Sequence, residues 1–199
     1  FPFILITPQA LDLTPISNPQ GVPWTVLTSA PGDGNIDVTL VTSILGCLEE
    51  SRAIDTRRIY SVGFSGGAIM TDLLHARFPD IFHSVVAMSG AFFNNSATVD
   101  GVNTMGMATV GWSDFPEGST GNVFMTHGGT GDTFSMAVVE VINFENAAQT
   151  DIPFLTDASR TVIDCPHSGG HTNHPSLSAM HFMDFFEAHP YGITSPYWQ

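Results

Sequence analysis

Lysine is absent from this 199-residue chain, and charged residues of either sign make up only 12% of it. Five basic residues, all arginine, stand against nineteen acidic ones, which gives a formal net charge of −14. Nucleic acids and anionic membrane surfaces carry charge of the same sign, so binding to either is disfavoured. We therefore expect no nucleic-acid partner and no membrane partner, and a neutral substrate is the easier expectation.

Cysteine is also scarce, with only Cys47 and Cys165, and long apolar runs are missing. Two cysteines cannot build a disulfide framework, so a single bridge and two buried thiols remain the alternatives. No apolar run approaches the roughly 20 residues that cross a bilayer. Residues 1–7 are apolar but lack a basic flank, so they do not form a signal peptide. Because the chain does not begin with Met, we expect a processed form or a fragment.

Hydrophobic residues make up 43% of the chain, which at this length predicts a single domain over residues 1–199 with a proper core. Short apolar runs alternate with helical patterns, and a long irregular loop is expected over residues 91–121. Strands are predicted at residues 3–6, 58–63, 84–88, 122–126 and 161–165, and helices at residues 36–50, 68–78, 135–148 and 176–188. This alternation predicts an α/β fold whose mostly parallel sheet is covered by helices on both faces.

A G-x-S-x-G pattern occupies residues 63–67. A strand-like run precedes it and a helical run follows it, and a strand-to-helix turn is the setting that exposes a nucleophilic serine. Side chains at Gly63 and Gly67 would collide across such a turn, which would hold Ser65 in a strained backbone conformation. The pattern predicts Ser65 as a nucleophile, and an ordinary Gly-rich turn is the alternative.

Asp132 ends a Gly-rich loop, residues 127–132, directly after the strand predicted at residues 122–126. An Asp in this place can accept a hydrogen bond from an imidazole and stabilise the imidazolium. An Asp in a Gly-rich turn often does no more than form the turn. Asp132 becomes a candidate acid because it lies between a candidate nucleophile and a candidate base.

The loop at residues 165–175 holds His167, His171 and His174. It offers no His pair at helical spacing and no carboxylate cluster, so we expect no metal site. His171 follows two glycines after the last predicted strand, which suits a base that must reach Ser65. His167 and His174 are expected to pack within the loop or lie at its rim. The chain order Ser, Asp, His is that of α/β-hydrolases.

Taken together, these motifs resemble secreted esterases related to polyhydroxybutyrate depolymerases and to feruloyl or acetylxylan esterases. The matching stretches are residues 4–10, 54–68, 127–132, 169–172 and 185–192. The resemblance implies the α/β-hydrolase fold, the triad Ser65, Asp132 and His171, and a carboxylic ester substrate. It further implies that no cofactor is needed and that the protein is secreted or periplasmic.

One expected part of the family pattern is missing. Family members usually have an earlier strand that ends in a His-Gly-type turn and supplies one oxyanion-hole N–H. Residues 3–7 match the strand after it, so we expect a minimal or N-terminally shortened version of the fold. Gly66 can still supply the N–H that follows the nucleophile, and the second donor is unassigned. An apolar edge strand at residues 3–6 needs cover, and the options are a homodimer partner, the loop at residues 11–34 or an upstream segment.

Trp24 and Trp112 lie in loops expected near the ends of the strands. An exposed Trp there could stack on an aromatic acid, a sugar or a flat polymer, and core packing is the alternative. Two rival functions remain open. One is a peptidase or thioesterase on the same fold, and the other is a hydrolase-fold protein that only binds ligands.

Overall fold

The computed structural model describes residues 3–8, 26, 35–106 and 110–193. Its central sheet has four parallel strands in the order β1-β2-β3-β6, and a separate antiparallel pair is formed by β4 and β5. The strands are β1 (Tyr60–Phe64), β2 (Ser84–Met88), β3 (Gly121–Thr126), β4 (Thr133–Met136), β5 (Val139–Asn143) and β6 (Arg160–Asp164). The helices are α1 (Ile36–Ser51), α2 (Gly66–Arg77), α3 (Ser96–Asp100), α4 (Phe144–Asp157) and α5 (Ala179–Ala188), with a 3-10 turn η1 (Gly129–Gly131).

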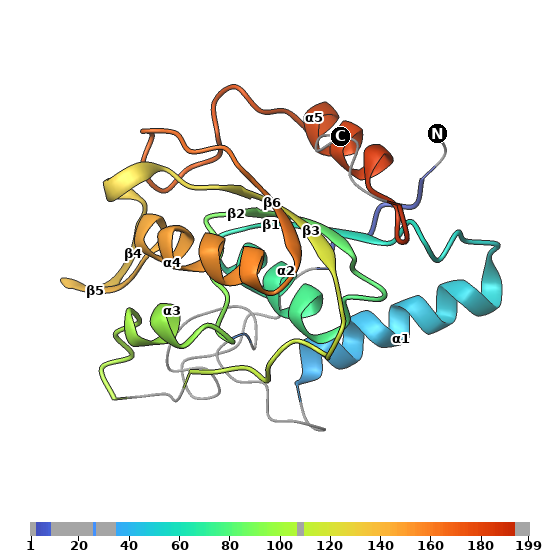
Figure 1. The fold of residues 1–199 in the computed structure, drawn as a ribbon, viewed down its shortest axis with the longest axis horizontal. Coiled ribbons are helices and arrows are strands. Elements are labelled where there is room, and N and C mark those ends of the chain that lie inside the picture. The colour runs from blue at the N-terminus through green and yellow to red at the C-terminus, as the bar shows by residue number, and fades with distance from the viewer. Residues whose placement is uncertain (1–2, 9–25, 27–34, 107–109, 194–199) are drawn as a thin grey trace.

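Successive residues of the central strands point to opposite faces of the sheet, and each face packs against helices. Val85 and Val123 belong to the larger apolar cluster, which also contains side chains of α2 and α4. Val86 and Phe124 belong to the smaller cluster with Phe185 of α5. Figure 1 shows α2 and α4 on one side of the sheet and α5 on the other. The prediction of a mostly parallel sheet with helices on both faces is confirmed.

The strand predicted at residues 3–6 is wrong, because the structure gives this segment no regular secondary structure. Its side chains are exposed, with Phe3 at 65% and Leu5 at 71%. The first strand of the sheet is β1, which pairs with β2 from Tyr60 to Phe64 and lies at an edge of the four-stranded order. An apolar run of four residues is consistent with a strand, but the run does not supply a neighbouring strand to pair with.

The helix predicted at residues 135–148 is also wrong. The chain there forms the β4–β5 hairpin, and α4 starts only at Phe144. Residues 138–142 are mostly β-branched, which favours a strand. Asn143 then caps α4, since its side-chain oxygen accepts a hydrogen bond from the Asn146 N–H at 3.0 Å.

The remaining elements follow the predictions closely. The long loop at residues 91–121 contains the short helix α3 (Ser96–Asp100), and α5 starts at Ala179, later than the predicted residue 176. Cys47 is an exposed free thiol and Cys165 is a half-buried one, so the two do not pair. Among the helices of the described part of the chain, none has both the length and the apolar character needed to cross a bilayer.

Candidate active site

Ser65 lies in the sharp turn between β1 and α2, with a φ of 56° and a ψ of −123°. A positive φ is unfavourable for a residue with a side chain and costs about 1–3 kcal/mol. The turn is held by the Ser65 N–H, which donates to the Met88 carbonyl at the end of β2 at 2.8 Å. A Cβ at Gly63 would collide with the Gly67 carbonyl, so glycine is required at position 63. The collision expected at Gly67 is wrong, because a Cβ there would meet nothing within 4 Å.

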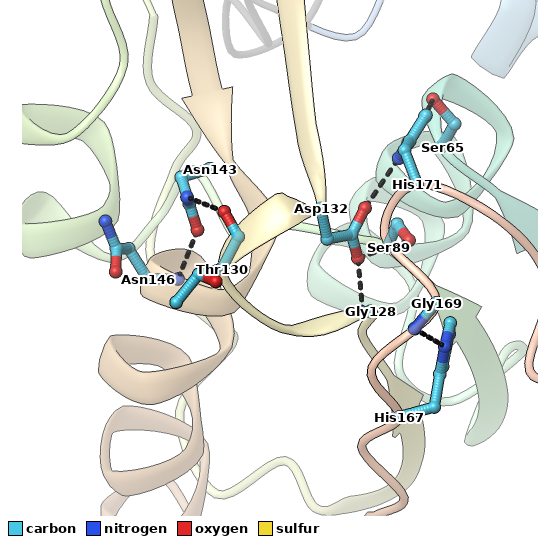
Figure 2. A network of polar contacts seen from close by, with 10 residues as sticks. All are labelled: Ser65, Ser89, Gly128, Thr130, Asp132, Asn143, Asn146, His167, Gly169 and His171. Carbon is cyan, nitrogen blue, oxygen red and sulfur yellow. Dashed lines mark hydrogen bonds and ion pairs between the residues drawn. The ribbon is translucent and has the colours of Figure 1, made fainter.

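The structure brings together the three residues that the sequence singled out. The Ser65 hydroxyl lies 2.9 Å from His171 Nε2, and His171 Nδ1 lies 2.6 Å from Asp132 Oδ1. Figure 2 shows the three side chains in line, with the imidazole between the hydroxyl and the carboxylate. Because the carboxylate accepts at Nδ1, it favours the tautomer that leaves Nε2 free to take the serine proton.

Asp132 is fully buried, and its second carboxylate oxygen is also bonded. Oδ2 accepts the Ser89 hydroxyl at 2.8 Å and the Gly128 N–H at 2.7 Å (Figure 2). Ser89 follows β2 directly and has a φ of 55°. With both oxygens engaged, the carboxylate has little freedom to rotate away from His171. Nothing in the sequence pointed to Ser89, which lies 43 residues before Asp132.

The loop that carries Asp132 and the loop that carries His171 are joined through their backbones. The His167 N–H donates to the His127 carbonyl at 2.8 Å, and the Gly170 N–H donates to the Gly128 carbonyl at 2.9 Å. These loops follow β3 and β6, which are neighbours in the sheet. Adjacent parallel strands therefore deliver both loops to the same edge, at the carboxyl ends of the strands.

Comparisons with known proteins find similarity to esterases. A family model described as esterase PHB depolymerase matches residues 21–114, which contain Ser65 but not Asp132 or His171. The resemblance noted in the sequence is confirmed. Feruloyl esterase B of Thermothelomyces thermophilus is 32% identical over 98 residues, which are 48% of this chain and 31% of that protein. The chain thus spans about a third of that relative's length.

Solved structures show the fold. Native pOPH matches with a TM-score of 0.65 at 18% identity, over 84% of this chain and 57% of that one. Native sOPH matches with a TM-score of 0.65 at 16% identity, over 85% of this chain and 60% of that one. A thermostable esterase matches with a TM-score of 0.52 at 15% identity, over 82% and 39% of the two chains. The chain has the α/β-hydrolase fold.

Two aromatic rings contact the imidazole of His171, and sequence reasoning found neither. The Phe144 ring stacks on it with centroids 5.0 Å apart and planes 10° apart. The Phe64 ring, next to Ser65, lies 4.9 Å away at 31°. Phe64 stands inside the G-x-S-x-G pattern, so its nearness to the site could have been read from the motif. Phe144 is distant in sequence, and no local signal marks it.

The other histidines of the two loops have separate partners. His127 Nε2 lies 3.6 Å from Asp164 Oδ1, and interaction with the Asp164 carboxylate raises the pKa of His127 above its ordinary value. His167 Nδ1 accepts the Gly169 N–H, and His174 Nδ1 accepts the Ser176 N–H. Among the described contacts, His167 and His174 bond within their own loop and not to Ser65, Asp132 or His171, as the loop-packing expectation requires. Among the described residues, no group of His, Cys, Asp or Glu is arranged to hold a metal ion.

Trp112 does not form the exposed stacking surface that the sequence suggested. Trp112 is 9% exposed, packs against Phe93, and donates its indole N–H to the Val26 carbonyl at 2.8 Å. It also lines a small cavity with Leu73 and Arg77 near the C-terminal end of α2. Ser65 precedes that helix, so the α2 residues that line the cavity lie roughly 12–18 Å from Ser65 along the helix axis. The expectation of a substrate-stacking Trp112 is wrong, and Trp24 lies outside the described residues.

Gly66 is the first residue of α2, directly after Ser65. The first bond within the helix runs from the Ile69 N–H to the Ser65 carbonyl, so the Gly66 N–H precedes the ladder of helical bonds. Ser65 does not cap the helix with its side chain. The Gly66 N–H is therefore placed to donate a hydrogen bond to an oxygen that becomes negatively charged next to Ser65.

Proposed function

We propose that this chain is a carboxylic ester hydrolase that works through an acyl-enzyme on Ser65. The observation that carries the proposal is the pair of hydrogen bonds at His171, one to the Ser65 hydroxyl at 2.9 Å and one to the buried Asp132 at 2.6 Å. A serine hydroxyl is a weak nucleophile unless an adjacent base removes its proton. His171 is so placed, and Asp132 stabilises the imidazolium that results.

Acylation begins when Ser65 Oγ bonds to the ester carbonyl carbon and its proton passes to His171 Nε2. The negative charge on the carbonyl oxygen is stabilised by the Gly66 N–H, and by a second donor that is unassigned. When the tetrahedral intermediate collapses, the C–O bond to the alcohol breaks and His171 returns its proton to the leaving oxygen. Water then repeats these steps on the acyl-enzyme and releases the acid and free Ser65. Removing one oxyanion donor typically costs a factor of about 10²–10³ in rate.

The substrate class rests on the relatives. A feruloyl esterase and a PHB depolymerase family model both match the chain, and both names describe ester cleavage. We propose a feruloyl, acetyl or polyester substrate, and a secreted or periplasmic location where such polymers occur. A net charge of −14 supports a neutral substrate and argues against nucleic acid or an anionic membrane as partner.

The test is Ser65→Ala, assayed with p-nitrophenyl acetate and butyrate. Hydrolysis should fall to background while the folded structure is retained, since Ser65 lies at a turn. Ser61→Ala is the matched control, because Ser61 lies in β1, the strand that leads to Ser65, and its hydroxyl bonds to the Thr71 hydroxyl at 2.7 Å. A fluorophosphonate should label wild-type protein at Ser65 and leave Ser65→Ala unlabelled. Turnover by Ser65→Ala near the wild-type rate would place the nucleophile elsewhere.

Two further measurements separate the rival functions. A panel of peptides and thioesters should be turned over far more slowly than the p-nitrophenyl esters if the chain is an esterase. Fast amide or thioester cleavage with poor ester cleavage would favour a peptidase or thioesterase. Binding of esters without any turnover or labelling would favour a protein that only binds ligands.

A further inference from the structure

We infer that Phe144 is a positioning residue that holds the plane of the His171 imidazole in line with Ser65 and Asp132. The inference rests on the proposed function and extends it to a residue outside the triad. Phe144 is the first residue of α4 and is 1% exposed. Its ring lies nearly parallel to the imidazole, with centroids 5.0 Å apart and planes 10° apart.

The two hydrogen bonds of His171 leave one motion of the ring poorly restrained. Bonds at Nδ1 and Nε2 fix the line that joins these two atoms, to Asp132 on one side and Ser65 on the other. The ring can still tilt about that line, and tilting takes the lone pair of Nε2 out of alignment with the serine proton. The stacked Phe144 ring opposes this tilt, because turning the imidazole away from its present plane gives up the face-to-face contact between the two rings.

The loop that carries His171 cannot supply this restraint by itself. Residues 165–175 belong to no helix or strand, and Gly169 and Gly170 precede the histidine. Gly170 has a φ of 70°, a conformation that favours glycine and leaves the chain without side-chain packing at that point. The His171 side chain is also 26% exposed, so one part of it meets solvent. Its contact with a fully buried ring is therefore a major restraint.

Phe144 is itself tied to the acid. Its N–H donates to the Asp132 carbonyl at 2.8 Å, so the residue that contacts the imidazole is also bonded to the residue that accepts from it. The preceding Asn143 donates to the Thr130 carbonyl at 3.2 Å and caps α4 at Asn146 (Figure 2). The start of α4 and the loop that ends in Asp132 therefore move together. The Phe144 ring keeps a fixed position relative to the carboxylate, as an alignment device must.

Phe144→Leu tests the inference, because it keeps an apolar side chain and the backbone bond but removes the flat ring. Phe92→Leu is the matched control. Phe92 is fully buried, and its ring contacts the rings of His75, Trp112 and Phe115. Both variants should lower the thermal midpoint to a similar degree, since each removes part of a buried ring. Phe144→Met repeats the test with an unbranched side chain if Phe144→Leu does not fold.

Only the Phe144 variants should disturb the alignment of the His171 imidazole with Ser65 and Asp132. With p-nitrophenyl acetate, kcat should fall roughly ten-fold or more while KM changes less than about two-fold, because misplacing a reacting group reduces the rate of chemistry. The downfield proton NMR signal of the His171–Asp132 hydrogen bond should broaden or disappear. Phe92→Leu should keep kcat within about two-fold and keep the signal. Wild-type kcat and an unchanged signal in Phe144→Leu would overturn the inference.

The outcomes also separate this inference from the proposed function. If the wild-type protein hydrolyses no ester and takes up no fluorophosphonate, the proposed function fails. The NMR signal of Phe144→Leu then still decides whether Phe144 orders the imidazole. If wild-type activity is present and Phe144→Leu retains it, the proposed function stands and the positioning role is wrong.

Discussion

Gly128 and Gly170 pack backbone to backbone in the two loops that carry Asp132 and His171. The Gly170 N–H donates to the Gly128 carbonyl at 2.9 Å, and a Cβ at Gly128 would collide with the Gly170 carbonyl oxygen. The Gly128 N–H donates to Asp132 Oδ2 at 2.7 Å. One glycine thus bonds to the acid and to the residue just before the base, and its lack of a side chain permits both contacts.

Gly128→Ala should therefore impair activity more than it impairs the fold. The new methyl group would push the two loops apart, which lengthens the bond from His171 to Asp132 or from Gly128 to Asp132. We expect kcat to fall roughly a hundred-fold, since small misplacements of catalytic groups carry penalties of that order. Gly131→Ala is the control, because a Cβ there would have only an ordinary contact of 3.7 Å, with Gly170. Equal kinetics for the two variants would show that the Gly128 contact is unimportant.

A second pair of residues predicts how stability changes with pH. Asp72 and Asp151 are fully buried, and they accept the N–H groups of Ala91 and Phe92 in the loop after β2. Burial raises the pKa of Asp151 from 3.8 to about 6, and burial together with the charge of Asp151 raises the pKa of Asp72 well above its ordinary value. Protonation of either residue is therefore easier in the folded chain than in the unfolded one.

The sign follows from these raised pKa values. The protonated carboxyl stabilises the fold fully below pH 3.8, and that stabilisation is lost as pH rises through about 6. A pKa change from 3.8 to about 6 corresponds to about 3 kcal/mol. The free energy of unfolding should thus rise between pH 7 and pH 5, and Asp151→Asn should reduce that slope. Asp100→Asn, which removes an exposed charge from α3, should keep it. Equal slopes in the two variants would contradict the prediction.

The histidine loop gives a third prediction. His171→Ala should remove ester hydrolysis, because it removes the base, whereas His167→Ala and His174→Ala should be milder. The rings of His167 and His174 contact each other with centroids 5.1 Å apart, and each accepts a backbone N–H two residues onward. If His174 proved indispensable, His171 would be the wrong base.

Local patterns in the sequence predicted the elements that carry the triad. Residues 84–88 and 122–126 are largely apolar and lie close to β2 and β3, because strands buried on both faces need apolar residues along most of their length. Residues 58–63 and 161–165 mix apolar and polar residues, and they lie close to the less buried strands β1 and β6. The turn at Ser65 was visible because its glycine requirement is local.

The parts that failed depend on contacts between distant segments. The indole of Trp112 could be exposed or buried, and its bond to Val26, 86 residues away, decides the matter. Ser89 reaches Asp132 across 43 residues. The Phe144 ring stacks on His171 from the start of α4, directly after the β4–β5 hairpin that stands where the sequence had predicted a helix. Periodicity within a short stretch of sequence shows which residues are apolar. Pairing between strands depends on residues outside that stretch, so periodicity cannot predict it.

The last prediction concerns self-association. Within the described residues the sheet ends at β1, where Val62 is 47% exposed, and Phe3, Ile4 and Leu5 are at least half exposed. An open strand edge and exposed apolar side chains both favour contact with another chain. Of the three kinds of cover suggested by the sequence, we propose the homodimer partner, which would contact these exposed apolar side chains although residues 3–6 are not a strand. Light scattering should give a mass that rises with concentration toward a dimer, and Leu5→Asp should shift the association to higher concentration. Val138→Asp, at a 97% exposed hairpin tip, should leave it unchanged. A wild-type mass that stays monomeric at all concentrations would rule out the homodimer.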